Sequence, residues 1–326
     1  MKKNISLISV LLCVMLGFSA CEKAADNSFF VGGPETANFN SGGMAQEDDK
    51  DASEEEEMDW ESIEIIPEKT SDSQVKIMSF NVRVLGDSGN NAWDARKKGI
   101  PVMVKTINPT TIGVQEATKT HLDYLAKNLT DYAYVGEGRE GGTRGESTAI
   151  FYKKDEVELI KSGTFWLSET PHQVSYGWNA QYLRIATWAI FKKKATNEFF
   201  FHMNTHLDFD DVTVANEVAL IARKCLEYNP NNYPGAFTGD MNTKESDSCF
   251  EPMKQLGYVS ARRQARDTDE SMTFNGFGSG SGIIDHVFSS VFKASKFKVV
   301  NEKYNGVTYL SDHYPVYAIL DFPLEN

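Results

Sequence analysis

The sequence has few cysteines and no long hydrophobic run beyond its first residues. It contains four cysteines in 326 residues, at positions 13, 21, 225 and 249, and the first two fall in the N-terminal leader. The two remaining thiols cannot build a disulfide framework. Cys225 and Cys249 each lie in a stretch with a helical pattern, so we expect two buried free thiols rather than a disulfide between them.

The first 21 residues have the features of a bacterial export signal. Two lysines precede an apolar run from Ile5 to Phe18, which is followed by Ser19, Ala20 and Cys21. This run of about 14 residues is shorter than the roughly 20 that span a bilayer. We therefore predict a lipoprotein signal peptide over residues 1–21. Its lipidated Cys21 would anchor the protein to a membrane of the bacterial cell envelope, at the outer membrane, the periplasmic face or the cell surface. The alternative is an ordinary signal peptide that releases a soluble protein.

Negative charge is concentrated in one segment. Residues 22–73 hold 16 of the 46 acidic and 3 of the 33 basic residues, whereas residues 74–326 hold 30 and 28. The composition of residues 22–73, with the run EDDKDASEEEEMDWE, predicts an acidic disordered tether. We interpret it as a solvated spacer, with an acidic partner-binding tail as the alternative. The near-neutral remainder lacks the basic surface of a tight nucleic-acid binder, so nucleic acid is not a favoured partner, and we expect a monomer.

Residues 74–326 have the length of one large α/β domain. Apolar, β-branched runs predict strands at 75–80, 111–115, 147–152, 185–191, 199–206, 235–240, 283–290 and 314–320. Helical patterns intervene at 93–107, 119–128, 213–228 and 246–256. The early strands alternate with helices, but the middle strands follow one another directly, which indicates mixed sheets. We therefore predict an α/β fold, a four-layer sandwich of two mixed β-sheets flanked by helices.

Polar residues follow nearly every predicted strand. They are Asn81, Glu116, His206, Asp208, Asp240, Asn242, Asp285, Asp312 and His313. Polar side chains gathered at one rim are costly to assemble unless a cation or substrate uses them. Oxygen donors without a Cys/His quartet favour magnesium, manganese or calcium. A hard cation beside imidazoles suits hydrolysis of a phosphoester by activated water, because the cation neutralises a phosphoryl oxygen and the imidazoles exchange protons.

The same segments carry a family resemblance. SFNVR, GVQEA, NTHLD, TGDMNT, IDH and SDHYPV, in this order, resemble the motifs of the endonuclease/exonuclease/phosphatase superfamily, which includes pancreatic deoxyribonuclease and bacterial neutral sphingomyelinases. The resemblance covers essentially all of residues 74–326, and FWLSETP and YGWNAQYLR further resemble a branch of bacterial secreted members. The chain departs from the family at residues 283–286, where Arg-Ile-Asp-Tyr is usual, and at Asn179, where aspartate is usual.

The resemblance implies a metal site that takes Mg²⁺ or Mn²⁺. Glu116 matches the glutamate that binds the catalytic metal, with Asn81 beside it, and Asp312 matches a carboxylate adjacent to the metal. Asp240 and Asn242 match the pair that positions the attacking water and holds a phosphate oxygen. We count Asp240 among the expected metal ligands as well.

The resemblance also implies two histidine–carboxylate pairs. His313 matches the histidine beside the scissile phosphate, and Asp285 the aspartate that orients it. His206 matches a second histidine, a phosphate binder or proton donor, and Glu146 a glutamate that steadies it. An acidic neighbour is expected to raise the pKa of each imidazole. Arg184 resembles an arginine that contacts phosphate.

Several polar residues have less specific interpretations. His202 alternates with buried aromatics and is expected to be a packed histidine, as is His121 on its helix. His286 is either an extra imidazole of the site or a residue that merely packs in place of tyrosine. Asp208 and Glu146 could instead be structural carboxylates that cap loops.

The residues leave the substrate class open. Near neutrality counts against long polyanions, so the first expectation is a metal-dependent phosphodiesterase that acts on a small or extracellular phosphoester substrate. A phosphomonoesterase or a nuclease of the same family is the alternative. A non-catalytic surface binding lipoprotein is a third possibility, and the presence of Glu116, Asp240 and His313 favours an enzyme over it.

Overall fold

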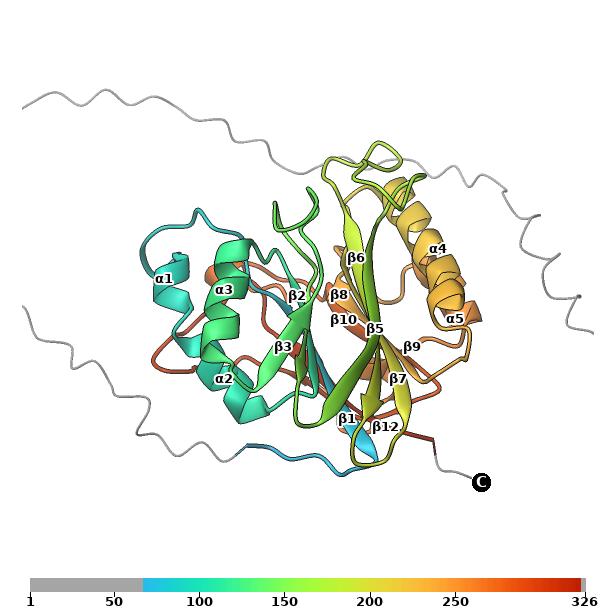
Figure 1. Cartoon of the computed structure of the whole chain (residues 1–326). Coiled ribbons are helices and arrows are strands. Elements are labelled where there is room, and N and C mark those ends of the chain that lie inside the picture. The colour runs from blue at the N-terminus through green and yellow to red at the C-terminus, as the bar shows by residue number, and fades with distance from the viewer. Residues whose placement is uncertain (1–66, 324–326) are drawn as a thin grey trace, which may run out of the picture. The chain divides into compact units, whose positions relative to one another are not determined.

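The computed structural model describes residues 67–323. The predicted signal peptide, Cys21 and most of the predicted tether therefore lie outside the described residues. The described chain forms two six-stranded sheets that face each other, with helices on the two outer sides (Figure 1). This arrangement confirms the predicted four-layer α/β sandwich of two mixed sheets.

The first four strands and the last two strands of the described chain form one sheet, and the six strands between them form the other. The first has the order β11 (Lys293–Val299), β12 (Val316–Asp321), β1 (Gln74–Asn81), β2 (Thr111–Gln115), β4 (Ile150–Lys153) and β3 (Tyr132–Val135). The second has the order β5 (Val157–Trp166), β6 (Ile185–Lys193), β7 (Phe199–His206), β8 (Gly235–Asp240), β10 (Asp285–Ser290) and β9 (Val259–Ser260). In each sheet one pair of central strands is parallel, β1 with β2 and β7 with β8, and the other pairs are antiparallel.

The helices cover the outer faces of the sheets. Figure 1 shows α1 (Trp93–Arg96), α2 (Gly99–Ile107) and α3 (Lys119–Asn128) beside the first sheet, and α4 (Asp211–Tyr228) and α5 (Glu251–Gln255) beside the second. The short helix α6 (Ala261–Gln264) precedes β10. The helix predicted over 93–107 is divided into α1 and α2. Pro101 explains the division, because its ring would clash with the carbonyl group of Lys97, four residues earlier.

Strand β11 was not among the predicted strands. Its sequence, KASKFKV, contains three lysines, and it lies at the edge of the first sheet. Lysines on an edge strand discourage pairing with another chain, so the charges that hid this strand from a hydrophobicity pattern suit its position.

Three apolar clusters fill the spaces between the four layers. Met78 of β1 belongs to the cluster under α2 and α3, and Phe201 of β7 belongs to the cluster under α4. The third cluster lies between the sheets and contains Ile77 and Phe200, the sequence neighbours of those two residues. Successive side chains of a strand point to opposite faces, so each central strand contributes to two clusters.

The space between the sheets changes from apolar to polar along β7. Phe200 belongs to the central apolar cluster, whereas His202, two residues further, accepts or donates hydrogen bonds with the hydroxyl groups of Thr111 and Thr238 at 3.0 and 2.9 Å. His202 is fully buried, and burial lowers its pKa to about 3. The next residue on this face, Asn204, accepts a hydrogen bond from Gln115 at 2.7 Å. The interpretation of His202 as a packed histidine is confirmed.

A glycine makes room for this polar layer. A Cβ atom added at Gly113 of β2 would lie 2.4 Å from Oδ1 of Asn204 and 2.5 Å from Oγ1 of Thr238. A side chain at position 113 would therefore push the two sheets apart directly below the strand ends that carry the predicted site.

The cysteines and His121 have the expected environments. Cys225 and Cys249 are buried free thiols. His121 is buried, and its ring lies 4.3 Å from that of Trp93, so it is a packed residue as predicted. Within residues 67–323, no helix is long and apolar enough to span a bilayer.

Contacts of the domain extend upstream of residue 74, where the sequence placed its start. The Glu68 carboxylate accepts hydrogen bonds from Nζ of Lys76 at 2.9 Å, Nζ of Lys296 at 3.0 Å and the hydroxyl group of Tyr317 at 3.1 Å. Its backbone N–H donates to the carbonyl oxygen of Thr106. Partial burial opposes ionisation of Glu68, but the two lysines outweigh it and lower the pKa to about 2. Glu68 thus ties the entering chain to the first sheet.

The contacts of the Glu68 carboxylate predict a stability that depends on pH. The folded-state pKa of Glu68 is below its ordinary value of 4.5. The stabilisation of the folded protein by the ionised carboxylate is therefore present above pH 4.5 and is lost as the pH falls toward 2. We expect Glu68→Gln to lower the Tm at pH 7 by about 2–4 °C, corresponding to about 1 kcal/mol. Thermal unfolding followed by circular dichroism should show this difference shrinking between pH 4.5 and pH 2. Asp123→Asn, which removes the exposed Lys119–Asp123 pair, serves as the control and should have little effect.

Candidate active site

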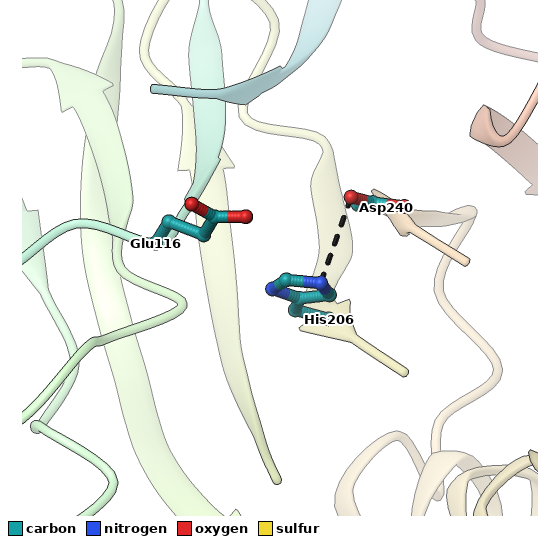
Figure 2. A group of neighbouring side chains, drawn as sticks. All are labelled: Glu116, His206 and Asp240. Atoms are coloured by element: carbon teal, nitrogen blue, oxygen red, sulfur yellow. Dashed lines mark ion pairs between the residues drawn. The ribbon is translucent and has the colours of Figure 1, made fainter. Parts of the chain in front are cut away.

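Strand register brings the predicted residues of the second sheet into one row. His206 of β7 is paired with Asp240 of β8, and Asp240 is paired with Asp285 of β10. In the first sheet, Asn81 of β1 is paired with Gln115 of β2, so Glu116 directly follows that row. Figure 2 shows Glu116 across from His206 and Asp240, at the rim where the two sheets meet.

Two of the predicted residues of this rim have left-handed backbone conformations. Glu116 has φ 58° and Asn242 has φ 51°. Such conformations cost about 1–3 kcal/mol in a residue with a side chain and persist where the surrounding structure requires them. The Glu116 carboxylate accepts a hydrogen bond from the Val84 N–H at 2.6 Å, and the Asn242 amide donates to the Leu207 carbonyl oxygen at 2.8 Å. Both side chains are thereby directed by backbone groups of the rim.

The predicted metal ligands lie together. The amide nitrogen of Asn81 donates to Oε1 of Glu116 and to Oδ2 of Asp240, each at 2.9 Å, so this side chain joins the two sheets. Ligand atoms of Glu116, His206 and Asp240 lie within 4.8 Å of one another. Asp312 lies in the same rim, 3.2 Å from the guanidinium group of Arg83.

These residues fit a hard divalent cation. Burial raises the pKa values of Asp240 and Asp312, and the nearby Glu116 carboxylate adds to the effect in both cases. Asp240 faces the imidazole of His313, Asp312 faces the guanidinium group of Arg83, and a divalent cation would offset the remaining negative charge of the three carboxylates. Carboxylate oxygens are also the donors that magnesium and manganese prefer.

His313 and Asp285 form the predicted pair. Nδ1 of His313 lies 2.9 Å from Oδ2 of Asp285, and Nε2 lies 3.6 Å from Oδ2 of Asp240. Burial alone would lower the pKa of His313, but the two carboxylates outweigh it and raise the pKa to about 10. The imidazole is therefore protonated near neutral pH, and the ring of Phe274 packs against it at 5.0 Å.

The predicted pairing of His206 with Glu146 is wrong. Glu146 instead forms a bidentate ion pair with Arg139, with distances of 2.8 and 2.9 Å, and His206 lies 3.5 Å from Asp240. The predicted rise in the pKa of His206 is also wrong. Burial lowers this pKa well below its ordinary value, and the positive charges of Arg184 and His313 add to the effect. Because Glu146 is paired with Arg139, its carboxylate is not available to the His206 imidazole.

A recess beside this centre contains the predicted phosphate-binding arginine. Arg184 lines it together with Arg139, Glu116, Glu146 and His206. Glu146 therefore belongs to the wall of the site, although it is not the partner of His206. Two guanidinium groups and an imidazole line the recess together with two carboxylates, and guanidinium groups bind phosphate oxygens through charge-assisted hydrogen bonds.

Arg184 lies within ion-pair distance of one buried acid, and a second buried acid holds the backbone of the first. Its Nε lies 3.7 Å from Oδ2 of Asp208, and the Asp208 N–H donates to the carboxylate of Glu217 on α4 at 2.9 Å. Burial raises the pKa of Glu217 to about 8. Asp208 therefore has a structural role, which the sequence analysis gave as an alternative, because it lies beside Arg184 and does not face the metal ligands.

His286 has the environment of a packed residue. Its Nε2 lies 2.8 Å from the Thr243 carbonyl oxygen, and its ring lies near those of Phe250 and Phe288. The structure therefore supports the packing interpretation of this position, where the family usually has tyrosine.

Three polar residues of the site were absent from the sequence-based list. They are Arg83, Arg139 and Glu217. Arg83 stands in the SFNVR motif and could have been found there. Arg139 lies in a glycine-rich segment and Glu217 in a helix, and nothing in either local pattern distinguishes them from surface charges.

Comparisons with known proteins agree with this geometry. The profile of the Endonuclease/Exonuclease/phosphatase family matches residues 78–313. A search of the curated proteins gave no match. The chain is 31% identical to the endonuclease/exonuclease/phosphatase from Bacteroides vulgatus, over 77% of this chain and 99% of that one, with a TM-score of 0.73.

Two structures from Bacteroides thetaiotaomicron are also similar. One is an endonuclease/exonuclease/phosphatase family protein with 30% identity, a TM-score of 0.72 and coverage of 77% of this chain and 99% of that one. The other is a mannosyl-6-phosphatase with 30% identity, a TM-score of 0.72 and coverage of 76% and 100%.

The division of labour among the histidines is testable by substitution. Positioned proton transfer contributes about 10²–10⁴-fold to a rate, so His313→Ala should lower kcat for a p-nitrophenyl phosphoester by that factor without unfolding the protein. Asp285→Asn should lower kcat by a large part of the same factor, and His206→Ala should also lower kcat. His202→Ala is the matched control, a buried histidine on the same strand that should affect the Tm alone. Equal losses of kcat at His202 and His206 would contradict this assignment.

Proposed function

The chain belongs to the endonuclease/exonuclease/phosphatase family, a family of phosphoester hydrolases, and on that premise we propose a specific activity. We infer that it is a divalent-metal-dependent phosphatase that removes the phosphate group from a small phosphorylated compound of the sugar phosphate type. The similarity to a mannosyl-6-phosphatase supports a phosphorylated sugar as the substrate.

The observation that carries the proposal is the pair of arginines in the recess. Arg139 and Arg184 both line it, next to His206 and Glu116. A phosphate monoester carries more negative charge than a diester and has only one substituent to accommodate. Guanidinium groups bind phosphate oxygens through charge-assisted hydrogen bonds, which favours the more highly charged monoester.

The residues of the rim divide the chemistry as follows. Glu116, Asn81, Asp312 and Asp240 would hold magnesium or manganese, which when bound neutralises charge on a phosphoryl oxygen. Asp240 lies between two imidazoles, with Oδ2 3.5 Å from Nε2 of His206 and 3.6 Å from Nε2 of His313. Its buried carboxylate can orient the attacking water and accept its proton, and Asn242 lies two residues further along the chain.

The two histidines act in different protonation states. His313, kept protonated by Asp285 and Asp240, donates a hydrogen bond to the phosphoryl group as negative charge develops there. His206, kept neutral by burial and by Arg184, orients a phosphate oxygen without adding a full charge. Asp208 and Glu217 position Arg184 for the same phosphate group.

A comparison of two synthetic esters tests this proposal. With magnesium, the protein should hydrolyse p-nitrophenyl phosphate with a higher kcat/KM than bis-p-nitrophenyl phosphate, and a chelator should abolish the activity until magnesium or manganese is restored. Arg184→Gln removes a charge-assisted contact worth about 1.5–3 kcal/mol, so kcat/KM for the monoester should fall about 10–100-fold, and less for the diester. Arg223→Gln, an exposed arginine on α4, is the control.

Each other outcome of this assay has a definite meaning. A higher kcat/KM for the diester would favour the phosphodiesterase that the sequence first suggested. Full activity in chelator would contradict the metal assignment. No hydrolysis of either ester with magnesium present would favour a non-catalytic binding protein.

We also propose that Cys21 attaches the enzyme to a membrane of the cell envelope. The support is the leader sequence, an apolar run followed by Ser19, Ala20 and Cys21. Expression of the full chain in a bacterium, followed by membrane fractionation, should place the wild-type protein in the membrane fraction. Cys21→Ser should move it to the soluble fraction or leave it unprocessed, and an unchanged distribution with normal processing would contradict lipidation.

A further inference from the structure

Two aromatic side chains remain exposed beside the recess. Tyr182 precedes β6 and is 43% exposed, and Phe209 follows β7 and is 57% exposed. Their ring centroids lie 6.3 Å apart, and the ring planes are inclined by 71°. The two rings thus form an open corner built from segments distant in sequence.

The aromatic corner, Tyr182 and Phe209, adjoins the phosphate-binding side of the site. The guanidinium carbon of Arg184 lies 5.2 Å from the centroid of Tyr182 and 5.4 Å from that of Phe209. The guanidinium carbon of Arg139 lies 5.5 Å from the centroid of Tyr182. Both arginines line the recess, so the rings lie next to the guanidinium groups that would bind a phosphate.

Exposure of two rings at this place needs an explanation. An aromatic side chain can bury about 150–250 Å², and each Å² of apolar surface removed from water contributes roughly 25 cal/mol. Both residues lie within three positions of a residue of the site, Arg184 or His206, so they are carried by the same strand ends. A ligand that covers them would recover this contribution on binding.

We propose that Tyr182 and Phe209 form a leaving-group subsite that binds the ring of a phosphorylated sugar. The inference rests on the proposed phosphatase function and adds the recognition of the group to which the phosphate is attached. A pyranose has apolar C–H faces that pack on aromatic rings. The inclined rings form a corner that suits a puckered ring, whereas a planar base stacks best on a flat platform or between parallel rings.

The opposing explanation is that the rings merely cover the guanidinium group of Arg184. In that case their loss would weaken phosphate binding for every substrate. A subsite for the leaving group predicts instead a loss confined to substrates that have a ring. The two cases therefore differ in the comparison of a cyclic with an acyclic phosphate monoester.

Steady-state kinetics with magnesium can make this comparison. For mannose 6-phosphate, Phe209→Ala and Tyr182→Ala should each raise KM at least 10-fold with kcat changed less than 3-fold. For glycerol 3-phosphate, which has no ring, KM should change less than 2-fold. Phe209→Leu retains an apolar cover but no aromatic face, and it should behave like Phe209→Ala. Leu226→Ala, an exposed apolar residue at the end of α4, is the matched control.

The outcomes separate the subsite from the phosphatase activity. Equal rises in KM for both esters, or wild-type KM values in both alanine variants, would overturn the subsite. If the wild-type protein hydrolysed neither ester, the phosphatase proposal would fail. The binding of mannose 6-phosphate would then test the subsite by itself. Saturation-transfer NMR in chelator should then show contacts to the sugar ring protons of mannose 6-phosphate that Phe209→Ala abolishes. Stronger transfer to the base protons of adenosine 5′-monophosphate than to sugar protons would overturn it in favour of a nucleobase.

Discussion

The Asp240 carboxylate is the point on which the rest of the site depends. Its Oδ2 accepts a hydrogen bond from Asn81 of the opposite sheet at 2.9 Å and lies within 3.6 Å of the imidazoles of His206 and His313. This one oxygen therefore fixes the distance between the two sheets at the rim. A buried carboxylate is stable only where polar or cationic groups surround it. Three separate segments, the ends of β1 and β7 and the segment that precedes β12, supply those groups, so the site exists only when both sheets are packed together.

The interior below the rim is arranged to support this polar centre. Along β7 the inward-facing residues change from Phe200 to His202, Asn204 and His206, that is, from an apolar core through a satisfied polar layer to the site. Both polar side-chain atoms of His202 and of Asn204 have hydrogen-bond partners, which avoids the penalty of about 1–3 kcal/mol for each unsatisfied group. Gly113 keeps that layer thin enough for the strand ends to meet.

A second set of charges surrounds the recess and comes from loops, from the start of β6 and from a helix. Arg139 is paired with Glu146, and Arg184 is held through Asp208 and Glu217. Glu146 and Asp208 are the acidic partners of the two guanidinium groups, and Glu146 itself lines the recess. Loops on a rigid sandwich can vary while the metal and histidine centre stays the same, which is how one fold can serve different phosphoesters.

Sequence alone determined the four layers, the two buried thiols and the residues that meet at the rim. Period-two alternation and polar residues at strand ends are local signals, and a strand register then brings Asp240, Asp285 and His206 together. Local patterns could not determine which carboxylate each imidazole meets. The family resemblance assigned Glu146 to His206, but Arg139, from the same glycine-rich loop, is its partner in the folded protein. Only the tertiary structure set the opposite pKa shifts of the two histidines, because burial and the charges of distant segments decide them.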